Sequence, residues 1–295
     1  MLFRFKHCAA RLLAGSFLLL FLHMPAYASM FSAPTPVPPV TPPPTVIAQP
    51  DTPAPITATP LPGFSLTVVT ENRQEQSGQT PFRVLIYHTH TYEAFTATEK
   101  YPYTSNEKWR TSNMQRNVVA LGAYLADLLT QAGISVTHDI TAFEPPDLSG
   151  AYIRSLAMLE NRAENGETYD LYIDLHRDAY SENNGPNTVL IDGEETARLM
   201  FLVGKGTGQT GAGYDIRPDF ESNHTIAQLL TNRLNIQAEN ICRAVKVKSG
   251  RYNQHIAPCC VLIEAGNNLN TLEEVLRAMP YLANAICTLA DGQIE

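Results

Sequence analysis

From about residue 64 onward, the chain alternates short apolar runs with longer stretches in which apolar residues recur every three or four positions. Short apolar runs between turn residues indicate buried β-strands, and the longer spacing indicates helices. The pattern predicts strands at 82–87, 134–138, 171–175 and 260–264, a strand pair at 188–191 and 198–203, and helices at 117–131, 151–164, 225–236 and 272–289. Strands that alternate with helices in this way predict an α/β fold, with a mostly parallel sheet and helices on both faces.

The first 63 residues have a different pattern. Basic residues precede an apolar run at 12–22, and the Ala-Tyr-Ala sequence at 26–28 has the form of a signal-peptidase site. Residues 1–28 are expected to be an export signal, either cleaved or kept as a membrane anchor, because the apolar stretch is near the shortest length that spans a bilayer. Residues 29–63 are rich in proline and are expected to form an extended linker. Residues 64–295 are expected to be one folded, extracytoplasmic domain.

Composition narrows the classes of function. The 295 residues are 44% hydrophobic and carry a formal net charge of −8, which argues against a nucleic-acid partner, because such proteins need a basic face. The five cysteines lack CxxC spacing, so a cysteine-ligated zinc site is not expected. Residues 206–211 fit G-x-G-x-x-G, but turn residues follow where a helix should begin. We interpret this segment as a loop at the edge of a cleft.

Residues that can bind a metal or move a proton follow three of the predicted strands. His88 and His90 come after VLIY, His176 comes after YIDL, and Glu264 ends CVLIE. A single histidine at a strand end is usually structural. The carboxyl ends of parallel strands, however, meet at one edge of a sheet, where ligands bind. The sequence therefore predicts a polar site at this edge.

The spacing of these residues favours a metal site. His90 and Glu93 form an H-x-x-E motif and, together with His176, make a His₂Glu set, which is a known arrangement for catalytic zinc. We predict His90, Glu93 and His176 as Zn²⁺ ligands and Glu264 as the general base that takes a proton from the attacking water. An alternative uses His88 and His90 as an H-x-H pair on one face of the strand. Otherwise His88 supports a ligand or is simply packed.

The residues around His176 are further candidates. Arg177 is a candidate catalytic residue that would hold a substrate carboxylate or polarise a carbonyl group. Asp178 would bind substrate or orient a ligand histidine, and Asp174 is a second candidate for orienting His176. The structural alternative is that Arg177 pairs with Asp178 or with loop residues.

Five stretches, in this order, resemble the stage II sporulation protein P family: YHTHTYEAF (87–95), NVVALGAYL (117–125), DLHRDA (174–179), GRYNQ (250–254) and LIEAGNNLNTLEEV (262–275). Members are membrane-associated cell-wall hydrolases of endospore-forming bacteria, related to zinc-dependent N-acetylmuramoyl-L-alanine amidases. The resemblance implies an amidase-type, phosphorylase/hydrolase-like α/β fold, Zn²⁺ as cofactor and peptidoglycan as substrate. The chain departs from the family in its AGNNLN sequence, where a glycine pair and an aspartate are usual.

The resemblance also implies roles for single residues. It places the ligand histidines at His90 and His176 and the catalytic glutamate at Glu264. Classical amidases have their ligand glutamate further along the chain, which makes Glu107 the second choice after Glu93. In the GRYNQ motif, Asn253 is a candidate substrate-binding residue.

The implied activity is cleavage of the amide between muramic acid and L-alanine, and of peptide cross-links, during septal thinning and engulfment. Implied partners are a lytic transglycosylase and a membrane scaffold protein, and the implied location is the membrane surface or the cell wall. Two alternatives remain open. One is a zinc carboxypeptidase acting on wall peptides. The other is a non-catalytic wall-binding module, against which the intact His90, Glu93, His176 and Glu264 argue.

Overall fold

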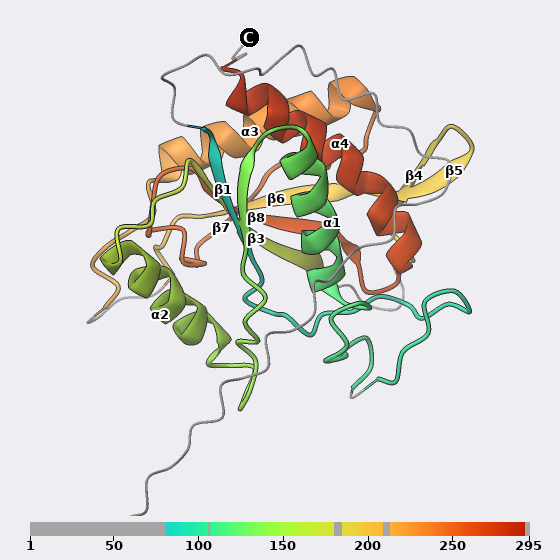
Figure 1. The fold of residues 1–295 in the computed structure, drawn as a ribbon, viewed down its shortest axis with the longest axis horizontal. Helices are drawn as coiled ribbons and strands as arrows, with labels where there is room; N and C mark the ends of the chain where they lie inside the picture. The colour runs from blue at the N-terminus through green and yellow to red at the C-terminus, as the bar shows by residue number, and fades with distance from the viewer. Residues whose placement is uncertain (1–80, 106, 180–184, 209–212, 293–295) are drawn as a thin grey trace, which may run out of the picture. The chain divides into compact units, whose positions relative to one another are not determined.

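The computed structural model describes residues 81–292, apart from 106, 180–184 and 209–212 (Figure 1). The predictions for residues 1–63 lie outside the described residues. Among the helices that are described, none combines the length and apolar character needed to cross a bilayer.

A six-stranded sheet forms the centre of the domain, in the order β2-β1-β3-β8-β6-β7. Its strands are β1 (Arg83–Tyr87), β2 (Ser135–His138), β3 (Leu171–Asp178), β6 (Leu199–Gly204), β7 (Lys246–Lys248) and β8 (Cys260–Asn267). The first four in that order run parallel, whereas β6 is antiparallel to β8 and parallel to β7. The predicted mostly parallel sheet is confirmed. The short exposed strand β7 was not predicted, because its sequence KVK carries little apolar signal.

The predicted strand pair is wrong in its second member. The strand β4 (Thr188–Ile191) pairs with β5 (Glu194–Ala197) and not with residues 198–203. Between them, Asp192 and Gly193 both have positive φ, at 51° and 83°, which suits a two-residue hairpin turn. The more apolar run that follows becomes β6, whose six residues are all buried in the main sheet.

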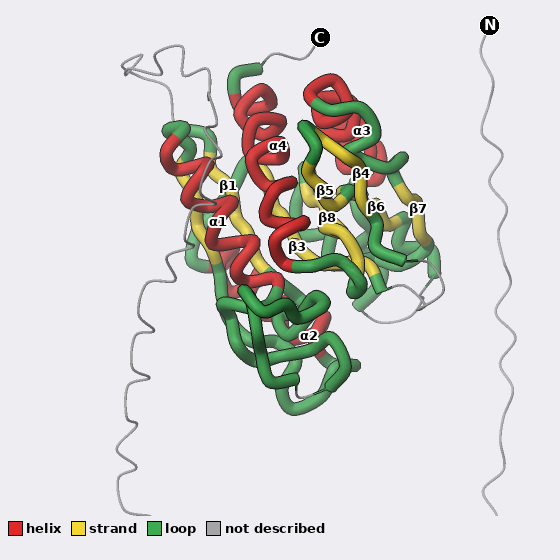
Figure 2. The backbone as a smooth tube through the Cα atoms, turned by 90° about the vertical axis from the view of Figure 1, so that its right-hand side faces the viewer, coloured by secondary structure: helices red, strands yellow, loops and turns green. Residues whose placement is uncertain are grey.

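Helices cover both faces of the sheet, but unequally. They are α1 (Val118–Gln131), α2 (Ala151–Glu164), α3 (Phe220–Gln237) and α4 (Leu272–Ala290). Figure 2 shows α1, α4 and α3 in a row along the sheet, with α2 apart from them. The larger core cluster contains side chains of α1, α3 and α4. On the other face, Leu159 of α2 packs in a smaller cluster with Leu85, Tyr87, Tyr172 and Cys260.

Caps explain where the predicted helices begin. Val119 N donates to the Asn117 side chain at the start of α1, at 3.0 Å. At the start of α4, Thr271 and Glu274 form a capping box. The helix α3 begins at Phe220, five residues before the prediction, because the Asp219 side chain caps it.

The order of the strands places the site. The neighbouring strands β1, β3 and β8 are parallel, so their carboxyl ends lie side by side at one edge of the sheet. These are the three strands whose ends carry the candidate residues, as predicted.

Candidate active site

The central strand β3 brings the candidate residues together. His176 and Glu264 are direct partners in the register of β3 and β8, so their side chains share a face. From the segment after β1, Glu93 Oε2 lies 3.3 Å from His176 Nδ1. The rings of His90 and His176 have their centroids 5.3 Å apart. The four side chains predicted as ligands and base therefore form one cluster.

A turn, and not the strand, presents His90 and Glu93. The strand β1 ends at Tyr87, and residues 89–92 form turns in which Glu93 N donates to His90 O at 3.2 Å. The expectation that His88 and His90 share one face of a strand is therefore wrong. His90 reaches the cluster, whereas His88 points into the core.

Glu93 is a buried carboxylate held in its ionised form. Its side chain accepts a hydrogen bond from Arg177 N at 3.1 Å, and Arg177 Nη1 lies 3.9 Å from its other oxygen. Burial alone would raise the pKa of Glu93, but His176 and Arg177 outweigh it and lower the pKa to about 2. Glu93 is therefore ionised at neutral pH.

His176 lies between two carboxylates. Its Nδ1 faces Glu93, and its Nε2 lies 2.7 Å from Asp174 Oδ1. Burial disfavours the charged imidazole, but Asp174 and Glu93 raise the pKa of His176 well above its ordinary value. The strong negative field at this ring would equally favour a bound cation.

A chain of buried polar groups fixes Asp174. Both Thr89 N and Thr89 Oγ1 donate to its carboxylate, at 2.8 and 2.7 Å. Thr89 Oγ1 also lies 2.9 Å from Ser155 Oγ of α2, to which Asn253 Nδ2 donates at 3.0 Å. The orientation of Asp174 beside His176 therefore depends on α2 and on the loop around Asn253.

Glu264 has the properties of a general base. Its Oε2 atom is buried and has no hydrogen-bond partner in the described part of the protein. Burial, with smaller contributions from neighbouring charges, raises its pKa to about 7. A carboxylate with this pKa can accept a proton near neutral pH and later return it.

The donor atoms of the cluster suit zinc in kind. Two imidazoles and a carboxylate are zinc ligands, and His90 Nδ1 is buried without a hydrogen bond in the described part of the protein. Within the described ranges, no three His, Cys, Asp or Glu side chains are arranged as a ready-made metal site. The chemistry of these residues fits the ion.

The other candidates lie around the cluster. Arg177 donates to the backbone oxygens of Ala94 and Trp109, at 3.0 and 3.2 Å, and is buried. Asp178 pairs with Arg243 at 2.8 Å. Asn253 is buried, and its amide donates to Tyr152 O and Ser155. Their catalytic and substrate-binding roles stay predictions. Glu107 is 78% exposed and is not brought into the cluster.

Sequence reasoning missed Glu144 and Tyr152. Glu144 is buried, with Oε1 3.5 Å from His90 Nδ1, and it pairs with Arg110. The ring centroid of Tyr152 lies 5.5 Å from that of His90 and 6.5 Å from that of His176. Glu144 follows β2 by six residues, and Tyr152 is in the first turn of α2, so no local pattern linked either to the histidines.

His88 is fully buried away from the cluster. Its Nδ1 lies 2.8 Å from Leu175 O, and its Nε2 lies 2.8 Å from His138 Nε2. Gly122 of α1 makes room for both rings, because a Cβ there would lie 2.5 Å from each Nε2. Burial lowers the pKa of His88 to about 4. Burial and the neighbouring His88 ring lower the pKa of His138 to about 3.

The neutral His88 predicts acid sensitivity. The unfolded chain takes up a proton at His88 near pH 6.5, whereas the folded protein resists it until about pH 4. The free energy of unfolding should therefore fall as pH drops through this range, by on the order of 3 kcal/mol from His88. His138 acts in the same direction. Glu264 has the opposite effect on the free energy of unfolding: its pKa is raised in the folded protein, so its contribution to stability increases as pH drops.

Urea unfolding of zinc-free wild type and His88→Gln at several pH values separates these contributions. The difference in the free energy of unfolding between wild type and His88→Gln should shrink steadily from pH 7 to pH 4.5. A difference that does not change with pH would contradict a neutral buried His88.

The fold and this cluster define an α/β protein with buried histidines and carboxylates at the carboxyl end of a mostly parallel sheet. The family profile described as stage II sporulation protein P matches residues 64–287. The chain belongs to this family.

The chain is also similar to an individual member of this family. The stage II sporulation protein P of Bacillus subtilis (strain 168) is 28% identical over 206 residues, which cover 66% of this chain. The match covers 48% of that protein, so this chain corresponds to about half of its length.

Among solved structures, two similar ones are amidases. The catalytic domain of CwlV, an N-acetylmuramoyl-L-alanine amidase from Bacillus (Paenibacillus) polymyxa, has a TM-score of 0.44 at 12% identity, over 71% of this chain and 98% of that one. The CwlD amidase from Clostridioides difficile, in complex with the GerS lipoprotein, has a TM-score of 0.44 at 12% identity, over 72% and 99%.

Proposed function

We propose that this protein is a zinc-dependent peptidoglycan hydrolase that cleaves the amide between N-acetylmuramic acid and L-alanine during sporulation. The observation that carries the proposal is the placement of Glu264, whose pKa is raised to about 7, opposite His176, whose Nδ1 lies 3.3 Å from Glu93. Family membership and the amidase names of the similar structures support the choice of substrate.

His90, Glu93 and His176 would hold the zinc ion. When bound, zinc would polarise the scissile carbonyl group and lower the pKa of the attacking water. The protein holds these ligands in place through Asp174 beside His176, Arg177 beside Glu93 and Glu144 beside His90.

Glu264 would move the proton. Its carboxylate would take a proton from the attacking water and pass it to the leaving amine. A group that does both works best when its pKa lies near the working pH. The rate should therefore depend on the ionised fraction of Glu264.

Arg177 is a poor candidate for holding a substrate carboxylate. Its guanidinium is buried and donates to two main-chain oxygens. We infer that it positions Glu93, and this removes one argument for the carboxypeptidase alternative.

The setting of the enzyme is also a proposal. An export signal or anchor at 1–28 and a linker at 29–63 would place the enzyme outside the membrane, at the cell wall. Cleavage of cross-links, a lytic transglycosylase partner and a membrane scaffold belong to the same proposal.

The first test is the zinc content of purified wild type and of His176→Ala. We expect about one zinc ion per wild-type chain. The folded variant should lose the zinc, because His176→Ala removes one of the three proposed ligands. Analysis of digested peptidoglycan should then show stem peptides released with a free L-alanine amine. Release of single C-terminal residues would instead favour the carboxypeptidase, and a folded wild type that takes up no zinc would favour the wall-binding module.

A further inference from the structure

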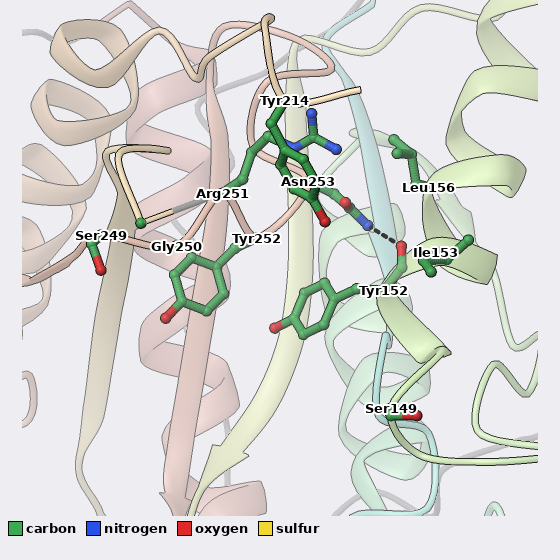
Figure 3. A pocket seen from close by; sticks show the side chains of 11 residues that line it. Ser149, Tyr152, Ile153, Leu156, Tyr214, Ser249, Gly250, Arg251, Tyr252 and Asn253 are labelled. Carbon is green, nitrogen blue, oxygen red and sulfur yellow. Dashed lines mark hydrogen bonds between the residues drawn. The ribbon is translucent and has the colours of Figure 1, made fainter. Parts of the chain in front are cut away.

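A cavity of about 470 Å³ opens beside the cluster. Figure 3 shows its side chains, which come from α2 and from two loops far away in the sequence. The lining includes Tyr152, Ile153 and Leu156 of α2, and Tyr214, Arg251 and Tyr252 of the loops. Its volume is in the usual range for sites that bind small ligands.

The cavity adjoins the proposed catalytic residues. Tyr152 is part of its wall and also contacts the rings of His90 and His176, with centroid distances of 5.5 and 6.5 Å. The ring centroid of Tyr252, which also lines the cavity, lies 5.9 Å from that of Tyr152. A molecule bound against Tyr152 would therefore lie close to His90.

Within the described residues, no acidic side chain pairs with the positive charge of Arg251. It donates to Gly213 O and lies 4.5 Å from the centre of the Tyr214 ring, and neither partner is charged. Three other arginines near the site each face a carboxylate: Arg110 faces Glu144, Arg177 faces Glu93, and Arg243 faces Asp178.

The loop that carries Arg251 is held in a costly conformation. Tyr252 and Asn253 have φ values of 51° and 54°, in the left-handed region that residues other than glycine rarely adopt. Asn253 Nδ2 donates to Tyr152 O at 2.9 Å and so ties this loop to α2. Such conformations persist where the surrounding contacts impose them, often at binding sites.

We propose that this cavity binds an acidic peptide, namely the stem-peptide part of the substrate, with Arg251 paired to one of its carboxylates. The proposal rests on the proposed function. Ile153, Leu156 and the tyrosine rings offer apolar contacts for the peptide chain.

Binding of N-acetylmuramoyl-L-alanyl-D-glutamate and of its diamide tests the proposal. Calorimetry is done on zinc-loaded full-length protein with Glu264→Gln, so that the probe is not cut. With Arg251 present, the free acid should bind about tenfold or more tightly than the diamide, because hydrogen bonds to charged groups contribute this much. With Arg251→Gln, this preference should disappear, and Arg251→Lys should restore part of it.

Two controls sharpen the result. Arg217→Gln removes an exposed cation that does not line the cavity, and it should leave the preference unchanged. The two monoamides show whether the α-carboxylate or the side-chain carboxylate meets Arg251.

Three outcomes would overturn the proposal: no binding of the free acid, no preference for the acid over the diamide, or equal weakening of both by Arg251→Gln. Hydrolysis by wild type is measured separately. If hydrolysis persists without the preference, only this inference fails. If the preference holds but wild type does not cut peptidoglycan, the proposed function fails and the peptide site stands.

Discussion

Replacing Glu264 with glutamine should lower the rate of peptidoglycan hydrolysis by about 100- to 10,000-fold, which is the usual contribution of a general base. Glutamine has nearly the same shape but cannot accept the proton. Zinc content should not change, because Glu264 is not one of the proposed ligands. The measurement is kcat/KM on a soluble muropeptide, with zinc measured in the same samples.

The pH profile gives an independent check on Glu264. Its pKa is raised to about 7 by burial, so wild-type kcat/KM should fall about tenfold per pH unit below pH 7. The same shift means that the buried charge destabilises the fold above pH 7. Glu264→Gln should therefore unfold at higher urea concentration than wild type at pH 8.

Glu273→Gln is the matched control. Glu273 pairs with Lys100 at the start of α4 and lies outside the cluster. It should change neither rate nor pH profile. If Glu264→Gln kept full activity, the assignment of Glu264 as the general base would be wrong.

Replacing Asp174 with asparagine should weaken zinc binding by about 10- to 100-fold, because Asp174 orients His176. The carboxylate lies 2.7 Å from His176 Nε2 and accepts two hydrogen bonds from Thr89. Loss of the charge should also lower the free energy of unfolding by about 1.5–3 kcal/mol. Competition with a chelator gives the zinc affinity, and urea unfolding of the zinc-free protein gives the stability.

Asp178→Asn, on the same strand, separates orientation from general destabilisation. Asp178 pairs with Arg243 and not with a predicted ligand. Its replacement should leave zinc affinity unchanged. If Asp178→Asn weakened zinc binding as much as Asp174→Asn, the assignment of Asp174 as the orienting carboxylate would be wrong.

The apolar pattern was sufficient for most of the fold. It predicted the strands that become β1, β2, β3 and β8, and the four helices, because each buries an apolar face or run. The hairpin partner of β4 was misassigned because the apolar run of β6 is stronger than that of β5. The Asp192-Gly193 turn was a usable signal.

Only the site residues at the ends of predicted strands could be predicted from the sequence. His176 and Glu264 follow from the parallel register, which places both at one edge. Glu144, Tyr152 and the cavity were not predictable, because they depend on how loops and α2 pack over that edge. The backbone of Tyr252 and Asn253, with φ values that glycine usually adopts, gives no sign in the sequence.

Of the described helices, only α2 packs on its face of the sheet, and this makes the proposed active site vulnerable in one place. α2 buries only Ala151, Ser155 and Leu159 of its fourteen residues, yet it carries Tyr152 of the cavity and the Ser155 link toward Asp174. A helix with so little buried surface can open on its own while the rest of the domain stays folded. Mild heating should therefore abolish catalysis reversibly before the core melts, and amide hydrogen exchange should be faster in α2 than in α1 or α4.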